Sequence, residues 1–264
     1  MPRRAWLLPT LLCSLLLMGC AHRRAGNGNY LAGIQTAPSG YAITGRMYLT
    51  LRSERFGLAG TTSTTMVVHR PDDLYLQVRG PVNNVMVQGT ANRQSLVVVI
   101  PPKNMAFVAD SPDAAMRALT GGAMGVDGVL ALLMARLPRD GLTVIESHPA
   151  GKLTEVTLEV AGGYHATAQV DHLHRLVGVD LTGPDGTLLA TVRYDGWTRD
   201  ARNFYPKQLT MEVPALDLHI GADFQAWEVM GEVPAIFSTP VPEGAEVKHL
   251  EDVLRPEAAA EEAP

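Results

Sequence analysis

Cys20 is the residue whose surroundings most clearly suggest a chemical step. It follows an apolar run from Trp6 to Met18, which is preceded by Arg3 and Arg4 and closed by the small residue Gly19. A positive start, a short apolar segment and a small residue form the pattern of a cleaved export signal. The run is too short to cross a bilayer, because a spanning helix needs about 20 residues. We therefore expect cleavage before Cys20 and attachment of acyl chains to its thiol.

The tetrapeptide Leu17-Met18-Gly19-Cys20 resembles the bacterial lipobox. Acylation of Cys20 would anchor the protein, since two or more acyl chains bind a membrane stably whereas one binds reversibly. Ala21 stands where an aspartate would indicate inner-membrane retention in many Gram-negative bacteria. The resemblance therefore predicts the periplasmic face of the outer membrane. An ordinary secretory signal with a chance cysteine is the alternative.

Elsewhere, the side chains do not have the spacing of a catalytic or metal site. His172 and His174 have no acid or cysteine beside them at a ligand spacing, so we expect a solvated turn or strand end. The stretch 121–128 lacks the lysine and Ser/Thr of a phosphate loop, and no serine lies in a G-x-S-x-G elbow. Cys13 would leave with the signal, so no disulfide or cysteine-based zinc site is available. The sequence thus predicts a non-enzymatic protein without metal or cofactor.

Charge and length limit the class of protein further. The mature chain would have 264 − 19 = 245 residues and a net charge of 20 − 27 = −7, because two arginines leave with the signal. A mildly acidic chain without a basic patch does not suit nucleic-acid binding. Nothing requires a second domain. We expect a signal peptide at 1–19, a lipidated tether at 20–39, one domain at 40–232, and a Pro-rich segment with a disordered acidic tail at 233–264.

Short runs of alternating apolar and polar residues occupy most of the segment 40–232. Residues 41–51, for example, place four apolar side chains on one face, as in a half-buried strand: Ile43, Met47, Leu49 and Leu51. Runs of this kind, divided by turns such as Gly162-Gly163 and Pro184-Asp185-Gly186, bring the total to about eleven strands. Strands joined by hairpins predict a mainly β fold, an antiparallel sheet or barrel.

The period changes in the middle of the chain. Ser111-Pro112-Asp113 has a capping side chain, a proline and an acid, as a helix start should, and Gly121-Gly122 end that helix. A second helix is expected with Asp127 as its cap and Pro138 as its stop. Two short amphipathic helices in a β chain must cover something apolar. We therefore expect them to form a lid over the sheet.

The apolar residues predict a cavity beneath this lid. Aromatic residues make up only 6% of the chain, which holds 11 methionines. Aliphatic side chains fill an interior less completely than aromatic ones, and methionine adapts to irregular space. We expect a curved, incomplete antiparallel barrel with short helices over an apolar cavity; a closed, fully packed barrel is the alternative. Strand and helix parity selects the lining residues Met47, Leu49, Met66, Val68, Leu76, Val87, Leu130, Leu133 and Met134.

The order of motifs between Leu74 and Pro138 adds a family resemblance. A strand Leu74-Tyr-Leu-Gln-Val leads into Gly80-Pro81-Val82-Asn83, then come a strand pair, a helix ending in Leu119-Thr120-Gly121, and a second helix closing with Ala135-Arg136-Leu137-Pro138. This order resembles the LolA/LolB lipoprotein-localisation family, LolB most of all, or an uncharacterised outer-membrane lipoprotein of the same fold. The loop at Pro81 and Val82 corresponds to Asn-Pro-Leu-Gly in the LolB pattern.

The resemblance implies a half-barrel whose interior holds the acyl chains of lipoproteins or lipids. Such a protein would accept them from a LolA-like periplasmic carrier and release them into the membrane, without nucleotide or metal. In that family an exposed leucine of the loop assists membrane insertion, and Val82 takes its position here. The alternative is a non-enzymatic structural or assembly lipoprotein of the cell envelope that uses the half-barrel as a protein-docking platform.

Overall fold

The computed structural model describes residue 34 and residues 42–54, 58–138, 141–200 and 203–254. This part of the chain contains 14 strands. They are β1 (Ile43–Ser53), β2 (Leu58–His69), β3 (Asp73–Arg79), β4 (Val85–Ala91), β5 (Leu96–Ile100), β6 (Met105–Ala109), β7 (Leu142–Ala150), β8 (Leu153–Val160), β9 (Tyr164–Val170), β10 (Leu176–Thr182), β11 (Leu188–Asp200), β12 (Asn203–Val213), β13 (Leu218–Val229) and β14 (Glu246–His249).

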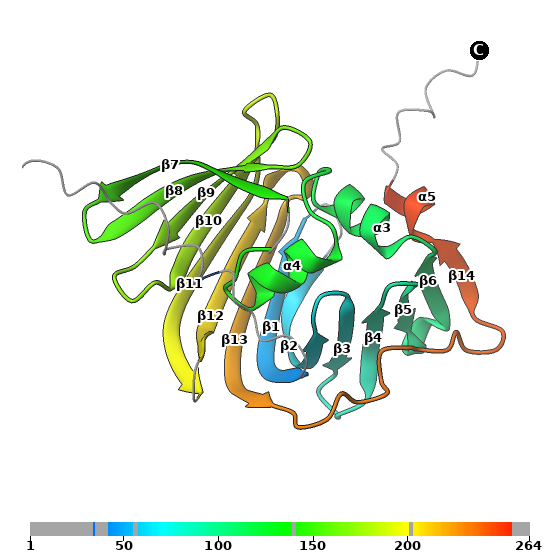
Figure 1. The fold of residues 1–264 in the computed structure, drawn as a ribbon. Coiled ribbons are helices and arrows are strands. Elements are labelled where there is room, and N and C mark those ends of the chain that lie inside the picture. Colours follow the sequence, from blue (N-terminus) through cyan, green and yellow to red (C-terminus); the bar gives the residue numbers. More distant parts are fainter. Residues whose placement is uncertain (1–33, 35–41, 55–57, 139–140, 201–202, 255–264) are drawn as a thin grey trace, which may run out of the picture.

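All these strands belong to one curved sheet, in the order β14-β6-β5-β4-β3-β2-β1-β13-β12-β11-β10-β9-β8-β7. Neighbours are antiparallel, except that β14 runs parallel to β6. The edge strands β14 and β7 do not pair with each other, so the barrel is incomplete (Figure 1). The expected mainly β, open architecture is confirmed.

The expected number of about eleven strands was too low, since the sheet has 14. One strand that sequence analysis missed is β14, which lies in the segment 233–264. All four of its residues are exposed, so it has no alternation of apolar and polar residues to reveal it. Only its pairing with β6 defines it as a strand.

Helices α3 (Pro112–Leu119) and α4 (Val126–Leu133) lie across the inner side of the sheet, and α5 (Leu250–Leu254) follows β14 (Figure 1). Two short 3-10 turns, η2 (Pro101–Lys103) and η3 (Pro214–Leu216), connect strands. Within the described ranges, no helix is long and apolar enough to span a membrane.

The two helices begin differently from the prediction. Gly125 is the N-cap of α4, and Asp127 lies inside its first turn. Ser111 precedes α3 without capping it through its side chain. Instead, the Oδ1 atom of Asp113 accepts a hydrogen bond from the backbone N–H of Val126 at 2.9 Å, so an acid of α3 caps α4. The second helix also ends before Pro138, because Ala135 takes a left-handed φ of 52°.

The register of the sheet defines its inner face. Residues paired across neighbouring strands point to the same side, and the pairs Met47–Thr64, Thr64–Val78 and Val78–Val87 connect β1 to β4. Parity along each strand then places six predicted residues together on that face: Met47, Leu49, Met66, Val68, Leu76 and Val87. The predicted alternation of these strands is therefore confirmed.

One large core occupies much of the space between the inner face and the helices. It includes Met66 and Leu130 as well as Ile34, whose side chain is fully buried. The carbonyl oxygen of Ile34 accepts a hydrogen bond from the backbone N–H of Leu137 at 3.1 Å. Ile34 belongs to the segment expected to be a tether, so at least this residue of 20–39 is part of the packed domain. The other residues of 1–39, Cys20 included, lie outside the described residues.

The segment after β13 lies on the outer face of β4 and β5. The side chain of Gln88 donates to the hydroxyl of Thr239 at 3.0 Å, and the backbone N–H of Thr239 lies 3.2 Å from the hydroxyl of Thr90. Their cross-strand partners Val97 and Val99 are buried on the same outer face. Beyond the predicted domain end at residue 232, Thr239 therefore contacts the outer face of β4, and β14 joins the sheet.

We expect truncation after residue 232 to lower the free energy of unfolding by about 3 kcal/mol, because it uncovers Val97 and Val99 and removes β14. Truncation after Leu254 keeps all of these contacts and serves as the control. Urea denaturation followed by circular dichroism measures both. Equal stability of the two truncated proteins would show that the C-terminal segment does not support the sheet.

Candidate functional site

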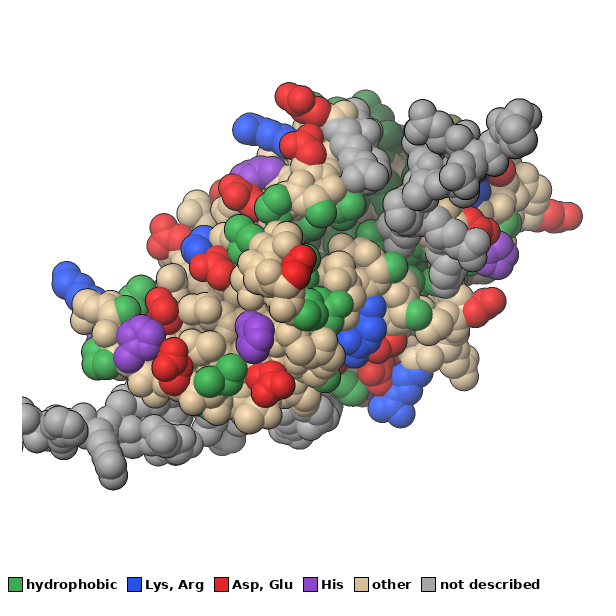
Figure 2. Space-filling model, turned by 90° about the horizontal axis from the view of Figure 1, so that it is seen from above, with side chains coloured by type: hydrophobic (Ala, Val, Ile, Leu, Met, Phe, Trp, Pro, Cys, Tyr) green, Lys and Arg blue, Asp and Glu red, His purple; other side chains and the backbone are tan. Residues whose placement is uncertain are grey.

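An apolar cavity of about 210 Å³ lies between the two lid helices and the inner face of the sheet. The two helices, the connection between them and the turn after α4 contribute Met116, Leu119, Thr120, Met124, Val129, Leu132, Leu137 and Pro138. The strands and η3 contribute Leu142, Val160, Ala166, Val179, Leu181, Ala190, Val192, Met211, Val213, Leu216, Leu218 and Ile220. Figure 2 shows hydrophobic side chains inside a hollow in the upper part of the view, with charged side chains on the surface nearby.

Cross-strand pairing explains why this lining is continuous. Ala166 pairs with Leu181, and Leu181 pairs with Ala190, which places three lining residues in one row across β9, β10 and β11. The pair Met211–Ile220 continues the lining on β12 and β13. Two of the three residues in the row are alanines, whose side chains occupy little of the space under the lid. The cavity therefore lies where small inner-face residues meet the helices.

The lining provides no free polar group for a ligand among the described residues. Thr120 is its only polar member, and its hydroxyl donates to the carbonyl oxygen of Met116 at 2.9 Å. The hydroxyl oxygen of Thr120 in turn accepts a hydrogen bond from the backbone N–H of Met124 at 3.0 Å. Thr120 therefore holds the turn between α3 and α4 instead of facing a ligand with an open hydrogen bond. The cavity suits a hydrocarbon.

Directional contacts fix both ends of α4 to the sheet. The guanidinium of Arg70, in the turn after β2, donates from Nε to the Oδ1 atom of Asp127 at 2.9 Å. At the other end, the hydroxyl of Tyr194 donates to the carbonyl oxygen of Leu132 at 2.6 Å. Burial raises the pKa of Tyr194 well above its usual range, so the hydroxyl keeps the proton that it donates. Hydrogen bonds thus connect α4 to β11 and to the turn between β2 and β3.

Arg136 adds a third contact just after the lid. Its Nη2 atom donates to the carbonyl oxygen of Phe204 at 3.0 Å, and its Nη1 atom donates to that of Ala135 at 3.0 Å. The side chain of Arg136 is buried, and this burial lowers its pKa. The nearby Tyr205 and Tyr194 offset part of this lowering of the pKa. The two carbonyl oxygens stabilise this buried charge, which would be costly without hydrogen-bond partners.

Two wider grooves adjoin the cavity. One, of about 640 Å³, shares Met124, Pro138 and Val160 with the cavity. Its charged walls are formed by Asp72, Arg93, Asp110, Asp113, Arg117 and Asp127. We call it the vestibule.

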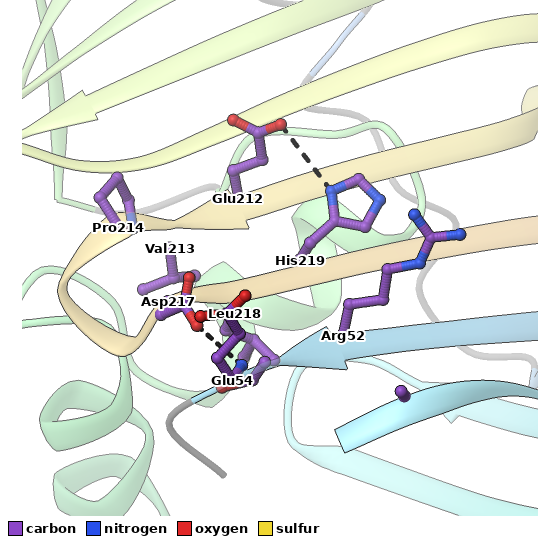
Figure 3. Close-up of a pocket in the computed structure, with 10 residues that line it drawn as sticks. Arg52, Glu54, Glu212, Val213, Pro214, Asp217, Leu218 and His219 are labelled. Carbon is purple, nitrogen blue, oxygen red and sulfur yellow. Dashed lines mark hydrogen bonds and ion pairs between the residues drawn. The ribbon is translucent and has the colours of Figure 1, made fainter. Parts of the chain in front are cut away.

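The other groove, of about 870 Å³, lies beside the β12–β13 hairpin and shares Val213 and Leu218 with the cavity. In Figure 3, Glu212 and His219 point toward each other, and Arg52 extends from β1 on the same side. The nearest oxygen of Glu212 is 3.8 Å from Nδ1 of His219. The backbone N–H of Glu54 donates to Asp217 at 2.7 Å, which joins the β1 end to this hairpin.

The six predicted strand residues lie on the inner face of the sheet, and none of the nine predicted lining residues lines the cavity under the lid. Met47, Leu49, Met66, Val68, Leu130 and Met134 are buried in the main core, and Leu76 and Leu133 pack against it. Val87 is half-buried on β4. None of these nine is among the described residues that line the cavity. Their role in holding acyl chains stays a prediction.

The lining residues that were missed had the same signal as those that were selected. Val179 and Leu181 alternate with polar residues in β10, and Ala190 and Val192 alternate in β11. Both segments have this alternation, but the strand residues predicted to line the cavity all came from the first half of the sheet. The sequence did not indicate which half of the inner face is covered by packed core side chains and which half borders a cavity.

The other predicted residues are clearly placed. Pro81 and Val82 lie at the exposed tip of the β3–β4 turn, where the Val82 side chain is 83% exposed. The turn is closed by a 2.9 Å hydrogen bond from the backbone N–H of Asn83 to the carbonyl of Gly80. His172 and His174 lie in the turn between β9 and β10, as expected. Within the described ranges, no three His, Cys, Asp or Glu side chains are arranged to hold a metal.

We expect Tyr194→Phe to lower the free energy of unfolding by about 1–3 kcal/mol, because the carbonyl of Leu132 loses its buried donor. Binding of a hydrophobic dye should increase as the lid loosens. Tyr164→Phe removes a donor to the carbonyl of Gly121 at a more exposed place, and serves as the control. Similar effects of both changes in thermal unfolding and dye fluorescence would contradict a specific role of Tyr194.

Solved structures share the fold of this chain, although sequence comparison finds no relatives. No protein-family model matches the chain, and no curated protein matches its sequence. An outer membrane lipoprotein-sorting protein domain from Vibrio parahaemolyticus superposes with a TM-score of 0.52 at 10% identity, over 74% of this chain and 87% of that chain. A LolA superfamily protein from Nitrosomonas europaea gives a TM-score of 0.55 at 12% identity, over 80% and 94%.

A DUF1329 family protein from Desulfovibrio piger gives a TM-score of 0.53 at 12% identity, over 75% of this chain and 89% of that chain. At such low identities the likeness establishes the fold. The predicted resemblance is confirmed at that level: the chain has the fold of LolA superfamily and lipoprotein-sorting structures.

Proposed function

We propose that this chain is a non-enzymatic, outer-membrane-anchored lipoprotein that takes acyl chains of lipoproteins or lipids into its cavity and passes them to the membrane. The observation that carries the proposal is the lining of the cavity, which is hydrocarbon and thioether apart from the already bonded Thr120. The fold shared with a lipoprotein-sorting domain supports the same reading.

The physical chemistry of such a site suits uptake and release. An acyl chain gains about 25 cal/mol for each Å² of apolar surface that it buries, and it needs no directional contacts. The lining contains Met116, Met124 and Met211, whose flexible thioethers adapt to chains of different shape. A bilayer offers the chain an equally apolar environment, so release into a membrane costs little.

Anchoring through acylated Cys20 would keep the domain close to the receiving membrane. The exposed Pro81 and Val82 support a further membrane contact, because an apolar tip on a turn can enter the interface. A LolA-like periplasmic carrier is the proposed donor of acylated cargo.

An assembly platform is the second candidate, and one observation favours it. The edge strand β7 has exposed apolar side chains, Val144 at 39% and Ile145 at 52%. Exposed sheet edges pair readily with an added strand. A platform of this kind would bind a protein segment and would not depend on the cavity.

The transfer of cargo distinguishes the two functions. A soluble form beginning at Ala21 is mixed with a periplasmic carrier loaded with a labelled acylated lipoprotein, and movement of the label is followed by gel filtration. Val129→Asp should reduce transfer at least about tenfold, because it puts a charge in the cavity. Leu133→Asp is the matched control on α4, since Leu133 is also half-buried but does not line the cavity.

If only Leu133→Asp lost transfer, the acyl chain would bind at the residues predicted from parity. The cavity that includes Val129 would then be rejected as the binding site. Transfer by neither the unaltered protein nor any variant, with all of them folded, would reject the carrier function for this cargo. That result would favour the second candidate function, the protein-docking platform.

Anchoring is tested by Cys20→Ser. The variant should lose incorporation of labelled palmitate and leave the outer-membrane fraction, because no other mature cysteine is available for acylation. Cys13→Ser is the control, since that cysteine lies within the expected signal. Membrane attachment that survives Cys20→Ser would contradict the lipid anchor.

A further inference from the structure

The volume of the cavity limits how much hydrocarbon it can hold. At about 210 Å³ it is larger than an apolar cavity of about 150 Å³ that holds benzene, and smaller than drug-sized pockets of about 300–1,000 Å³. A methylene group takes up about as much space as a water molecule in the liquid, about 30 Å³, so the cavity has room for about seven carbons. Two chains side by side would each be limited to three or four.

The walls of the cavity are held in place. On one side, Ala166, Leu181 and Ala190 belong to hydrogen-bonded strands inside the sheet. On the other side, α4 is tied at both ends by Arg70 and Tyr194. Widening the cavity for a second chain would break these two polar contacts, at a cost that a single chain avoids.

The vestibule gives the remainder of the ligand a place in water. It meets the cavity at Met124, Pro138 and Val160, and its other walls include charged side chains. A chain that enters here leaves its head group, and any further chain, outside the apolar lining.

We propose that the site accepts one acyl chain at a time, to a depth of about seven carbons, and that lipids with several chains are bound through only one of them. This inference rests on the proposed function, because it specifies how the same cavity is used. It makes affinity depend on the length of one chain and not on the total amount of hydrocarbon.

Phosphocholine lipids provide the test, since head group and chain number can be varied separately. The mature chain, residues 20–264, carries Cys20→Ser so that its own lipid cannot fill the cavity. Calorimetry measures binding of lysophosphatidylcholines with chains of four to twelve carbons below their micellar concentrations. Affinity should rise about fourfold per carbon up to about seven carbons and then level off.

Dihexanoyl-phosphatidylcholine should bind within about fourfold of the hexanoyl lysolipid, because its second chain stays outside. A rise that continues to twelve carbons, or a second chain that strengthens binding more than about a hundredfold, would overturn the single-chain inference while leaving the acyl-binding function intact. Absence of binding by every lipid would instead reject the proposed function.

Ala190→Phe adds a ring inside the cavity and should lower affinity for the octanoyl lysolipid at least about tenfold, with the plateau moved to a shorter chain. Thr191→Phe is the matched control, because the next residue of β11 points to the opposite face of the sheet. Ala166→Leu, a smaller filling on β9, serves if Ala190→Phe does not fold. An unchanged plateau in a folded filling variant would also overturn the inference.

Discussion

The apolar inner face of one continuous sheet has to be removed from water, and most of the structure follows from that requirement. Neither edge strand reaches the other, so the sheet cannot cover its own interior by closing. The covering falls to α3 and α4, which have only eight residues each. Two such short helices do not cover the whole concave inner face of the sheet. The first half of the sheet is packed tightly by Met66, Leu130 and Ile34, whereas the second half retains a cavity beneath the lid.

The lid combines two kinds of interaction with different physical properties. Its apolar side holds to the sheet through contacts without directional demands, while a few polar contacts, from Arg70 and Tyr194, determine where α4 lies. Buried polar groups are costly when they lose their partners, so these contacts define one preferred position. An acyl chain satisfies the apolar part of the arrangement without competing for the polar part. A site of this kind can bind hydrocarbon and keep its architecture.

Sequence patterns predicted the faces of the strands correctly, and the lining residues that they selected lie apart from the cavity under the lid. Met47 and Leu76 share the inner face, as alternation required, yet the neighbouring core fills the space in front of them. Ala166 and Ala190 leave space because they are small and lie on one row with Leu181. Alternation is a property of each strand alone, whereas free volume depends on every side chain that approaches the same point. The role of Val82 and Cys20 stays a prediction from their motifs.

The sequence by itself determined the class of fold, the face of each alternating strand, the hairpin turns and the presence of two short helices. These features arise from local rules: period-two alternation, glycines with positive φ such as Gly162 and Gly186, and a proline at the first position of α3. Only the tertiary structure decided that β14 joins the sheet, that Asp113 caps α4 from another helix, and that the cavity lies against β7–β13. Each of these depends on residues distant in sequence meeting in space, and local periodicity carries no information about such meetings.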